Sequence, residues 1–277
     1  MSAAGFSSAA AVTWGGSDFA GGLGARKAPA QLIVASGHLV SFVLLLAVCL
    51  GLRLPFPQQA GVWFAVLGGF EGSLALAVFY RALAMGAMGL TAAFTGLLTA
   101  LVPVLFSMLR EGLPGGSVLG GIGVGLAAIW LITRQPGEQG QKTPPLALLL
   151  GAMAGCGFGA QLILFKLAGS CGLLWTMTSA RAAGSVAMLL VIAVAPPKAV
   201  WKGFWRMGIL AGLLDTIGNL FYICATQRGR LDVAAMISSL YPAVTILLAG
   251  ALLHERPSKR QLAGMVLALA AVLLLSR

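Results

Sequence analysis

The stretch QLIVASGHLVSFVLLLAVCLGL, residues 31–52, decides what kind of protein this chain forms. It contains no Asp, Glu, Lys or Arg, and it is close to the ~20 apolar residues that a helix needs to cross a bilayer. A second apolar run follows the basic segment at the start of RPSKRQLAGMVLALAAVLLLSR, residues 256–277. Both runs indicate that lipid is the solvent of this protein.

The composition agrees with a membrane protein. Of all residues, 59% are hydrophobic and 9% are charged, whereas a soluble domain carries about 25% charged residues. The apolar run that begins almost at Met1 is a poor signal peptide, because no Lys or Arg precedes it and its basic pair, Arg26-Lys27, follows it. The net charge of +11 is scattered between apolar runs, so we expect no nucleic-acid partner. The four cysteines lie far apart without C-x-x-C spacing, and we expect no metal, disulfide or cofactor.

The apolar runs predict an all-α integral membrane protein with ten transmembrane helices. We place the spans at residues 4–25, 31–52, 61–82, 87–109, 115–133, 146–168, 173–195, 207–226, 231–253 and 259–276. The polar stretch RQPGEQGQKTPP, residues 134–145, separates two sets of five spans. The expected organisation is a first repeat over residues 1–134, a linker over 135–145 and a second repeat over 146–277.

Aligning the two halves supports a duplication. The alignment places Gly68 on Gly212, Glu71 on Asp215, Glu111 on Glu255 and Gly120 on Gly264. Because five spans are an odd number, the halves must enter the membrane in opposite orientations. Such a five-plus-five inverted-topology repeat is typical of secondary transporters, whose binding site lies at the midplane between the halves.

Several segments resemble the drug/metabolite transporter superfamily in its ten-helix EamA-type branch. They are TWGGSDFAGGLGARKAP in the first span, FYRALAMG after the third, and SSLYPAVTILLAGALLHERPSKRQLAGMVLALAAVLLL at the end. The first half departs from the pattern, since Pro103 lies nearer to Glu111 than Pro242 lies to Glu255. The resemblance implies a transporter, often an exporter, of small organic solutes with a central cavity. It also implies a multi-pass protein of a bacterial-type inner (plasma) membrane.

The ionisable residues within the spans are the first candidates for function. They are Asp18, Glu71, Lys166, Arg181 and Asp215, and a charge at the bilayer centre costs about 2.5–3.5 kcal/mol on insertion scales. Arg181 is either a functional charge or the partner of a carboxylate that holds helices together. Lys166 lies near a span end and can extend its amine to the interface.

Glu71 and Asp215 are predicted to lie at matching depths, near the midplane of inverted halves. Burial in lipid disfavours the charged form of a carboxyl group and so favours proton binding. We therefore expect Glu71, Asp215 and Asp18 to couple a proton or cation to solute movement. The alternative is a neutral or Arg181-paired carboxyl that only stabilises helix packing.

The first span is predicted to form a wall of the substrate site. Helical spacing places Trp14 and Asp18 on one face with Ala11, Gly15 and Gly22. A ring beside a carboxylate suits an amine, although the same face could be a packing seam of small residues. Related faces add residues from other spans, so the predicted substrate-binding set is Trp14, Asp18, Phe158, Gln161, Asn219, Tyr222 and Tyr241.

Three further features have open alternatives. His38 is expected to pack within the protein, with a proton relay as the alternative. Pro242 should leave a free carbonyl or a kink in the ninth span. The run GGSVLGGIGVGL, residues 115–126, contains Gly116-x-x-x-Gly120 and Gly121-x-x-x-Gly125, which favour tight packing within a monomer or, alternatively, a weak homodimer contact.

These patterns predict a gradient-driven secondary transporter that works by alternating access. The chain lacks P-loop, H-E-x-x-H and G-x-S-x-G sequences, so we do not expect an enzyme. The alternative function is an intramembrane enzyme for lipid or isoprenoid substrates that uses Asp18, Glu71 or Asp215 as acid or base. Lys and Arg are more frequent in the loops on the side opposite the termini, which predicts that both termini lie outside the cytoplasm.

Overall fold

The structure is a computed structural model that describes residues 1–57, 61–85, 88–133, 144–197, 203–253 and 258–276. Within these ranges the regular elements are all helices, which confirms the all-α prediction for this part of the chain. Most of the expected linker, residues 134–143, lies outside the described residues, as do His254 and Glu255.

The helices coincide with the predicted spans to within a few residues. Their bounds are α1 Ala3–Ala25, α2 Ala30–Gly51, α3 Gly61–Ala84, α4 Met88–Glu111, α5 Gly116–Thr133, α6 Pro145–Leu167, the short 3₁₀ helix η1 Ala168–Cys171, α7 Leu173–Val194, α8 Phe204–Thr226, α9 Leu231–Ser238, α10 Tyr241–Leu253 and α11 Lys259–Leu275.

The predicted ninth span is broken into two helices. α9 ends at Ser238, and α10 begins at Tyr241 after a turn over Ser239 and Leu240. Pro242 has no N–H to donate to the Ser238 carbonyl four residues earlier, so one helical hydrogen bond is missing at the break, whereas Pro103 lies within α4 without ending that helix. This break is a stronger form of the expected kink. Every residue from 231 to 242 is buried, so α9 is enclosed on all its faces.

Six helical stretches in the described ranges are long and apolar enough to cross a membrane. They are Ala30–Gly51, Gly61–Leu83, Pro145–Leu167, Leu173–Val194, Phe204–Thr226 and Leu231–Leu252, the last of which includes the break. Large apolar side chains such as Leu109, Val194 and Leu269 are exposed on the outside of the bundle, as expected of a surface in lipid. The chain is a multi-pass membrane protein, while ten crossings remain a prediction.

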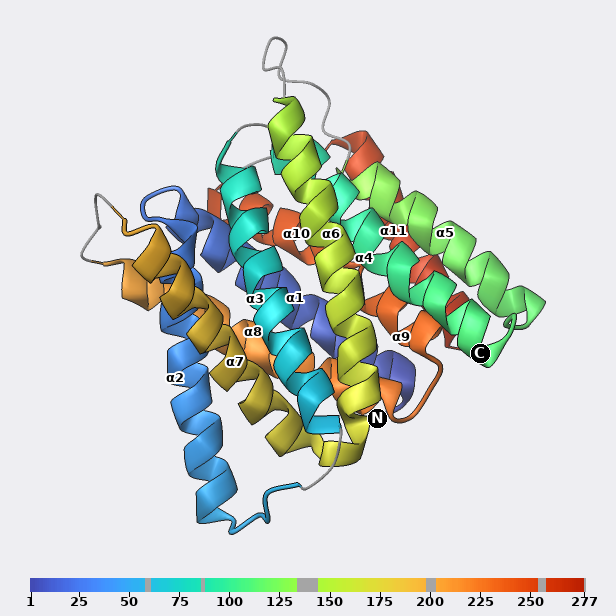
Figure 1. The fold of residues 1–277 in the computed structure, drawn as a ribbon. Helices are drawn as coiled ribbons and strands as arrows, with labels where there is room; N and C mark the ends of the chain where they lie inside the picture. The colour runs from blue at the N-terminus through green and yellow to red at the C-terminus, as the bar shows by residue number, and fades with distance from the viewer. Residues whose placement is uncertain (58–60, 86–87, 134–143, 198–202, 254–257, 277) are drawn as a thin grey trace.

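The helices pack in pairs that join the two halves of the chain. α1 lies against α8, α3 against α6, α2 against α7, and α5 against α11. In Figure 1, α2 and α7 lie on one flank of the bundle and α5 and α11 on the other. The middle of the bundle is therefore surrounded by helices from both halves.

A close crossing joins α2 to α8 through glycines. A Cβ added to Gly37 would lie 2.7 Å from the Gly212 Cα, and one added to Gly208 would lie 2.6 Å from the Ile33 carbonyl oxygen. The Ser41 hydroxyl donates to the Gly212 carbonyl at 3.2 Å across this contact. Gly208-x-x-x-Gly212 is thus a small-residue packing motif of the kind that lets membrane helices approach closely.

The glycine-rich run in α5 has two different sides. Gly121 and Gly125 pack against Leu275 and Met236 within the protein, as expected. Gly116 and Gly120 are exposed, and a Cβ added to either would meet no atom within 4 Å among the described residues. Only part of this run therefore contributes to internal helix packing.

Cationic side chains tie helix ends together at the end of the bundle where α4 finishes and α9 starts. The Arg230 guanidinium donates to both Asp232 carboxylate oxygens and, at 2.8 Å, to the Gly112 carbonyl that follows α4. The hydrogen bond with Asp232 raises the pKa of Arg230, so the guanidinium stays charged. The Lys166 amine donates to the carbonyls of Thr226 and Gly229, where it complements the negative end of the α8 dipole.

Arg230→Gln should therefore weaken this end of the bundle. Asp232 is fully buried, and without the guanidinium its carboxylate would keep, among the described residues, only its hydrogen bond from the Val233 N–H. We expect a loss of about 1–3 kcal/mol, the usual cost of an unsatisfied buried polar group. Thermal unfolding of the purified protein in detergent measures the change. Arg110→Gln, an exposed arginine at the same end, is the matched control and should leave the unfolding temperature unchanged.

Candidate substrate cavity and charge network

A cavity of about 40 Å³ lies between the two halves of the chain. It has room for a few water molecules, since one water needs about 10–15 Å³ of such volume. Helices α1, α3, α4, α6, α8 and α10 all contribute to its wall. The lining residues are Trp14, Asp18, Leu76, Thr99, Phe158, Gln161, Leu162, Asp215, Asn219 and Tyr241.

The structure brings most of the predicted substrate-binding residues together. Trp14, Asp18, Phe158, Gln161, Asn219 and Tyr241 all line this cavity. Leu76, Thr99 and Leu162 line it as well and were not predicted. Leu76 and Leu162 had no signal in the sequence, because a leucine in a membrane helix does not reveal whether it faces lipid, another helix or a cavity.

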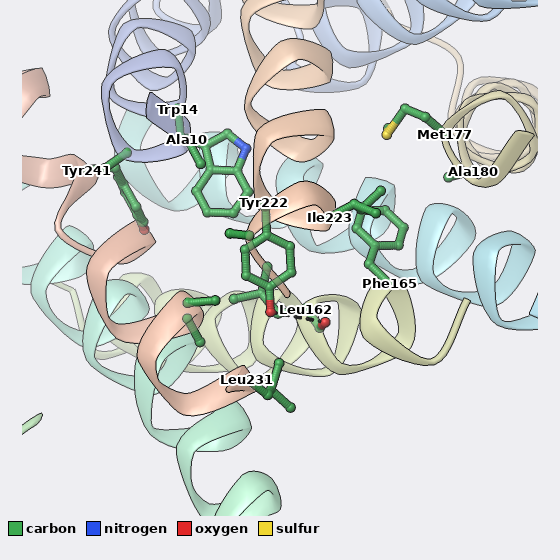
Figure 2. Close-up of a cluster of buried hydrophobic side chains, with 14 of the residues drawn as sticks. Ala10, Trp14, Leu162, Phe165, Met177, Ala180, Tyr222, Ile223, Leu231 and Tyr241 are labelled. Carbon is green, nitrogen blue, oxygen red and sulfur yellow. Dashed lines mark hydrogen bonds between the residues drawn. The ribbon is translucent and has the colours of Figure 1, made fainter. Parts of the chain in front are cut away.

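Aromatic rings form one side of the cavity. The Trp14 ring lies 5.7 Å from the Tyr222 ring and 6.5 Å from the Tyr241 ring, which meets it edge-on at 89°. Figure 2 shows these three rings converging from α1, α8 and α10. A Cβ added to Gly218 would lie 2.5 Å from the Trp14 ring, so this glycine leaves room for the indole.

Tyr222 supports the wall and does not line the cavity. Its hydroxyl donates to the Leu162 carbonyl at 3.2 Å, so the polar end of the ring joins α8 to α6 (Figure 2).

The α1 face has the geometry of both predicted alternatives, a wall of the cavity and a packing seam of small residues. Gly15 packs closely against Val244 and the Tyr241 carbonyl, while Trp14 and Asp18 on the same face reach the cavity.

Two carboxylates line the cavity, but only one has a cationic partner. The Arg181 guanidinium donates to Asp215 at 2.5 Å, and the Arg181 side chain is 2% exposed. Asp18 takes part in no ion pair or hydrogen bond with another described residue. The cluster of Asp18, Asp215 and Arg181 thus has one net negative charge when both carboxyl groups are ionised.

Asn219 adds a neutral acceptor to the same wall. Its amide nitrogen donates to the Asp215 carbonyl at 2.8 Å, one helical turn earlier in α8. Its side-chain oxygen is buried without a hydrogen-bond partner in the described part of the chain. An unpaired acceptor beside an unpaired carboxylate favours a ligand that donates hydrogen bonds.

Glu71 does not join Asp215 on the wall of this cavity. Its carboxyl group lies against Gly157 of α6, and its Oε2 atom is buried with no hydrogen-bond partner among the described residues. α3 presents Leu76 to the cavity instead. The expected arrangement, in which both acids face one cavity, is therefore not what the structure contains. The physical reason is that α3 packs along α6 and turns the Glu71 face into that contact.

His38 occupies a more central position than its sequence context indicated. Its Nδ1 lies 3.0 Å from the Ser73 hydroxyl, and its Nε2 lies 2.7 Å from the Arg181 Nη1. Its Nε2 is also 4.0 Å from the Asp215 Oδ2 atom.

Lys166 lies apart from this network, near the end of α6, where its amine donates to the carbonyls of Thr226 and Gly229. In the described ranges, no three His, Cys, Asp or Glu side chains gather as metal ligands would.

The described helices and the central cavity define a helical membrane protein. Residues 145–277 match the EamA-like transporter family, consistent with the drug/metabolite transporter superfamily. No curated protein matches the chain. A solved structure described as "Crystal structure of protein" is similar, with a TM-score of 0.80 and 18% identity. The similarity covers 98% of this chain and 95% of that one, so the two share a fold along their whole length.

Proposed function

We propose that this protein is a secondary transporter that exports small metabolites with an ammonium group, such as amines or amino acids, across a bacterial-type inner membrane. The observation that carries the proposal is the unpaired Asp18 carboxylate in a cavity walled by Trp14 and Tyr241. An ammonium group would pair with this carboxylate by charge. It would also bind the face of the Trp14 indole by cation–π attraction, and that interaction is worth about 2 kcal/mol or more when desolvated. The acceptor oxygen of Asn219 can take a further N–H.

The packing of the helices supports a five-plus-five inverted repeat. If α9 and α10 count as one span, a shift of five spans exchanges α1 with α6 and α3 with α8. The α1–α8 pair then becomes the α6–α3 pair, and the α2–α8 pair becomes the α7–α3 pair. The family match also begins at residue 145, one residue before the expected start of the second repeat at residue 146. Such a repeat suits alternating access, because the halves can rock around a cavity between them.

Proton or cation coupling is the proposed driving force. Asp18 and Asp215 line the substrate cavity, so a proton and an ammonium group would compete for the same negative charge. Glu71 is a half-buried acid whose Oε2 atom is buried, and it can hold a proton outside the cavity next to α6. We further propose that both termini lie outside the cytoplasm, since the loops richer in Lys and Arg lie at the opposite end.

Asp18→Asn tests the substrate class. Asn keeps the size of the side chain and removes the charge, so the variant should fold normally and lose at least about tenfold in amine affinity, or ~1.4 kcal/mol. The ligands are phenethylamine and 2-phenylethanol, which share a phenyl ring and differ in the ammonium group. Binding is measured by thermal shift, and transport by uptake of labelled phenethylamine into proteoliposomes, with protein-free vesicles subtracted.

The matched control is Glu111→Gln, which removes an exposed carboxylate at a helix end and should leave binding unchanged. Trp14→Ala should weaken phenethylamine binding through loss of the aromatic face. The proposal is wrong if the wild type binds 2-phenylethanol as well as phenethylamine, or if Asp18→Asn keeps wild-type amine uptake.

A further inference from the structure

We propose that His38 is the proton-carrying residue of the transport cycle, and that Asp215 exchanges its bond to Arg181 for a bond to protonated His38. The inference deepens the proposed function and rests on it. It assigns coupling to a histidine at the centre of the charge network instead of to a carboxylate alone. The geometry of His38, Ser73, Arg181 and Asp215 carries it.

The hydrogen bonds around His38 determine its tautomer. Arg181 has only donors, so the His38 Nε2 atom, 2.7 Å from Nη1, must be the acceptor and carry no proton. The neutral ring then has its proton on Nδ1, which donates to the Ser73 hydroxyl at 3.0 Å. Ser73 in turn donates to the Gly69 carbonyl at 2.6 Å. The only ring position that can take up a proton is therefore the one that faces Arg181.

Uptake of a proton by Nε2 removes the acceptor that Arg181 uses. A new N–H bond forms on Nε2, the hydrogen bond from Arg181 Nη1 is lost, and two cations face each other. Because Nε2 is already 4.0 Å from Asp215 Oδ2, a small movement lets the new N–H bind this carboxylate. Arg181 is then displaced from Asp215, its carboxylate partner on the wall of the substrate cavity.

A second, smaller cavity of about 10 Å³ lies beside the network, close to the space that one water molecule needs. Its wall includes Ser17, His38, Tyr80 and Asp215. Asp215 also lines the substrate cavity, so the two spaces meet at this carboxylate.

The groups that act on His38 come from each helix packed against α2. α7 contributes Arg181, α8 contributes Asp215, and α3 contributes Tyr80, while Glu71 on α3 lies against α6. α1 contributes the Ser17 hydroxyl to the same wall, and its Asp18 acts on Asp215 across the substrate cavity.

The charge of the cluster sets the stoichiometry. With His38 neutral, Asp18, Asp215 and Arg181 have one net negative charge, which a single ammonium group balances. A proton on His38 balances the same charge and frees Arg181 to approach Asp18. Substrate and proton therefore exclude each other, which predicts electroneutral exchange of one proton for one monovalent amine.

The transport experiment compares wild type, His38→Gln and His254→Gln in proteoliposomes with labelled phenethylamine, corrected for entry into protein-free vesicles. The substituted glutamine amide would still offer Arg181 an acceptor but cannot take up a proton. One-for-one exchange sustains about a tenfold amine gradient for a pH difference of one unit. We expect His38→Gln to lose this accumulation and retain amine exchange at equal pH, with His254→Gln unchanged. Wild-type rates should not respond to membrane potential.

A second measurement needs no transport and compares the wild type with two variants. The chain has two histidines, so ¹⁵N-histidine labelling yields two ring systems, and His254→Gln assigns them. We expect a neutral Nδ1–H tautomer for His38 at neutral pH, with a hydrogen-bonded Nε2 that changes in Arg181→Gln. An Nε2–H tautomer overturns the proposal, as does pH-driven accumulation that survives in His38→Gln. If the wild type moves no amine, the proposed function fails, and the tautomer alone decides the role of His38.

Discussion

Gly212→Val is expected to prevent the protein from folding into a stable bundle. A Cβ at this position would lie 2.5 Å from the Gly37 carbonyl carbon, and the obstructing atoms belong to the backbone of α2. A flexible side chain can move aside, but two helix backbones can separate only if the α2–α8 contact opens. The loss should exceed the ~1–3 kcal/mol that overpacking a core usually costs.

Opening this contact would also disturb the charge network. α2 carries His38 directly after Gly37, and α8 carries Asp215 one turn after Gly212. Size-exclusion chromatography and thermal unfolding in detergent would show aggregated or strongly destabilised protein. Gly120→Val, in which the added side chain meets open space on α5, is the matched control and should purify like wild type. A monodisperse Gly212→Val protein with an unchanged unfolding temperature would contradict the crossing.

Arg181→Gln is expected to have the second large effect. The guanidinium is buried, binds Asp215 and donates to His38, and Gln cannot make both contacts from its shorter side chain. Removing one member of a buried ion pair leaves an uncompensated charge and costs about 3–5 kcal/mol. We expect a large fall in the thermal unfolding temperature in detergent, together with loss of amine transport.

The double variant Arg181→Gln/Asp215→Asn separates stability from function. Asn at position 215 removes the uncompensated charge, so much of the lost stability should return. Transport should stay lost, because neither the carboxylate nor its exchangeable partner is present. A double-variant cycle measures the coupling energy between the two residues. Additive losses of stability would show that Arg181 and Asp215 do not act as a pair.

Hydropathy located most of the helices, but not the short helix η1 or the break between α9 and α10. Runs such as residues 31–52 must be helical in lipid, because only a helix satisfies all its backbone hydrogen bonds within one segment. Local chemistry also predicted a free carbonyl or a kink near Pro242, since the missing N–H is a property of the residue itself, whereas only the structure showed the full break into α9 and α10. The i and i+4 spacing of Trp14 and Asp18 predicted one shared face, and helical geometry guarantees that relation wherever the helix lies.

Contacts between distant residues were not predictable in this way. Gly116-x-x-x-Gly120 and Gly208-x-x-x-Gly212 have the same spacing, yet only the second lies at a close helix crossing. The spacing shows that a helix can be approached closely, whereas the neighbour that approaches depends on how the other helices pack.

The charged residues show the same division between sequence and tertiary structure. Sequence alone determined that Glu71, Arg181 and Asp215 lie within apolar helices, and that such charges need partners or a function. The tertiary structure alone decided that Asp215 binds Arg181, that Glu71 lies against α6, and that His38 completes the network. The physical reason is that pairing depends on distances of a few ångströms between helices far apart in the chain, which the rotation and crossing of packed helices set.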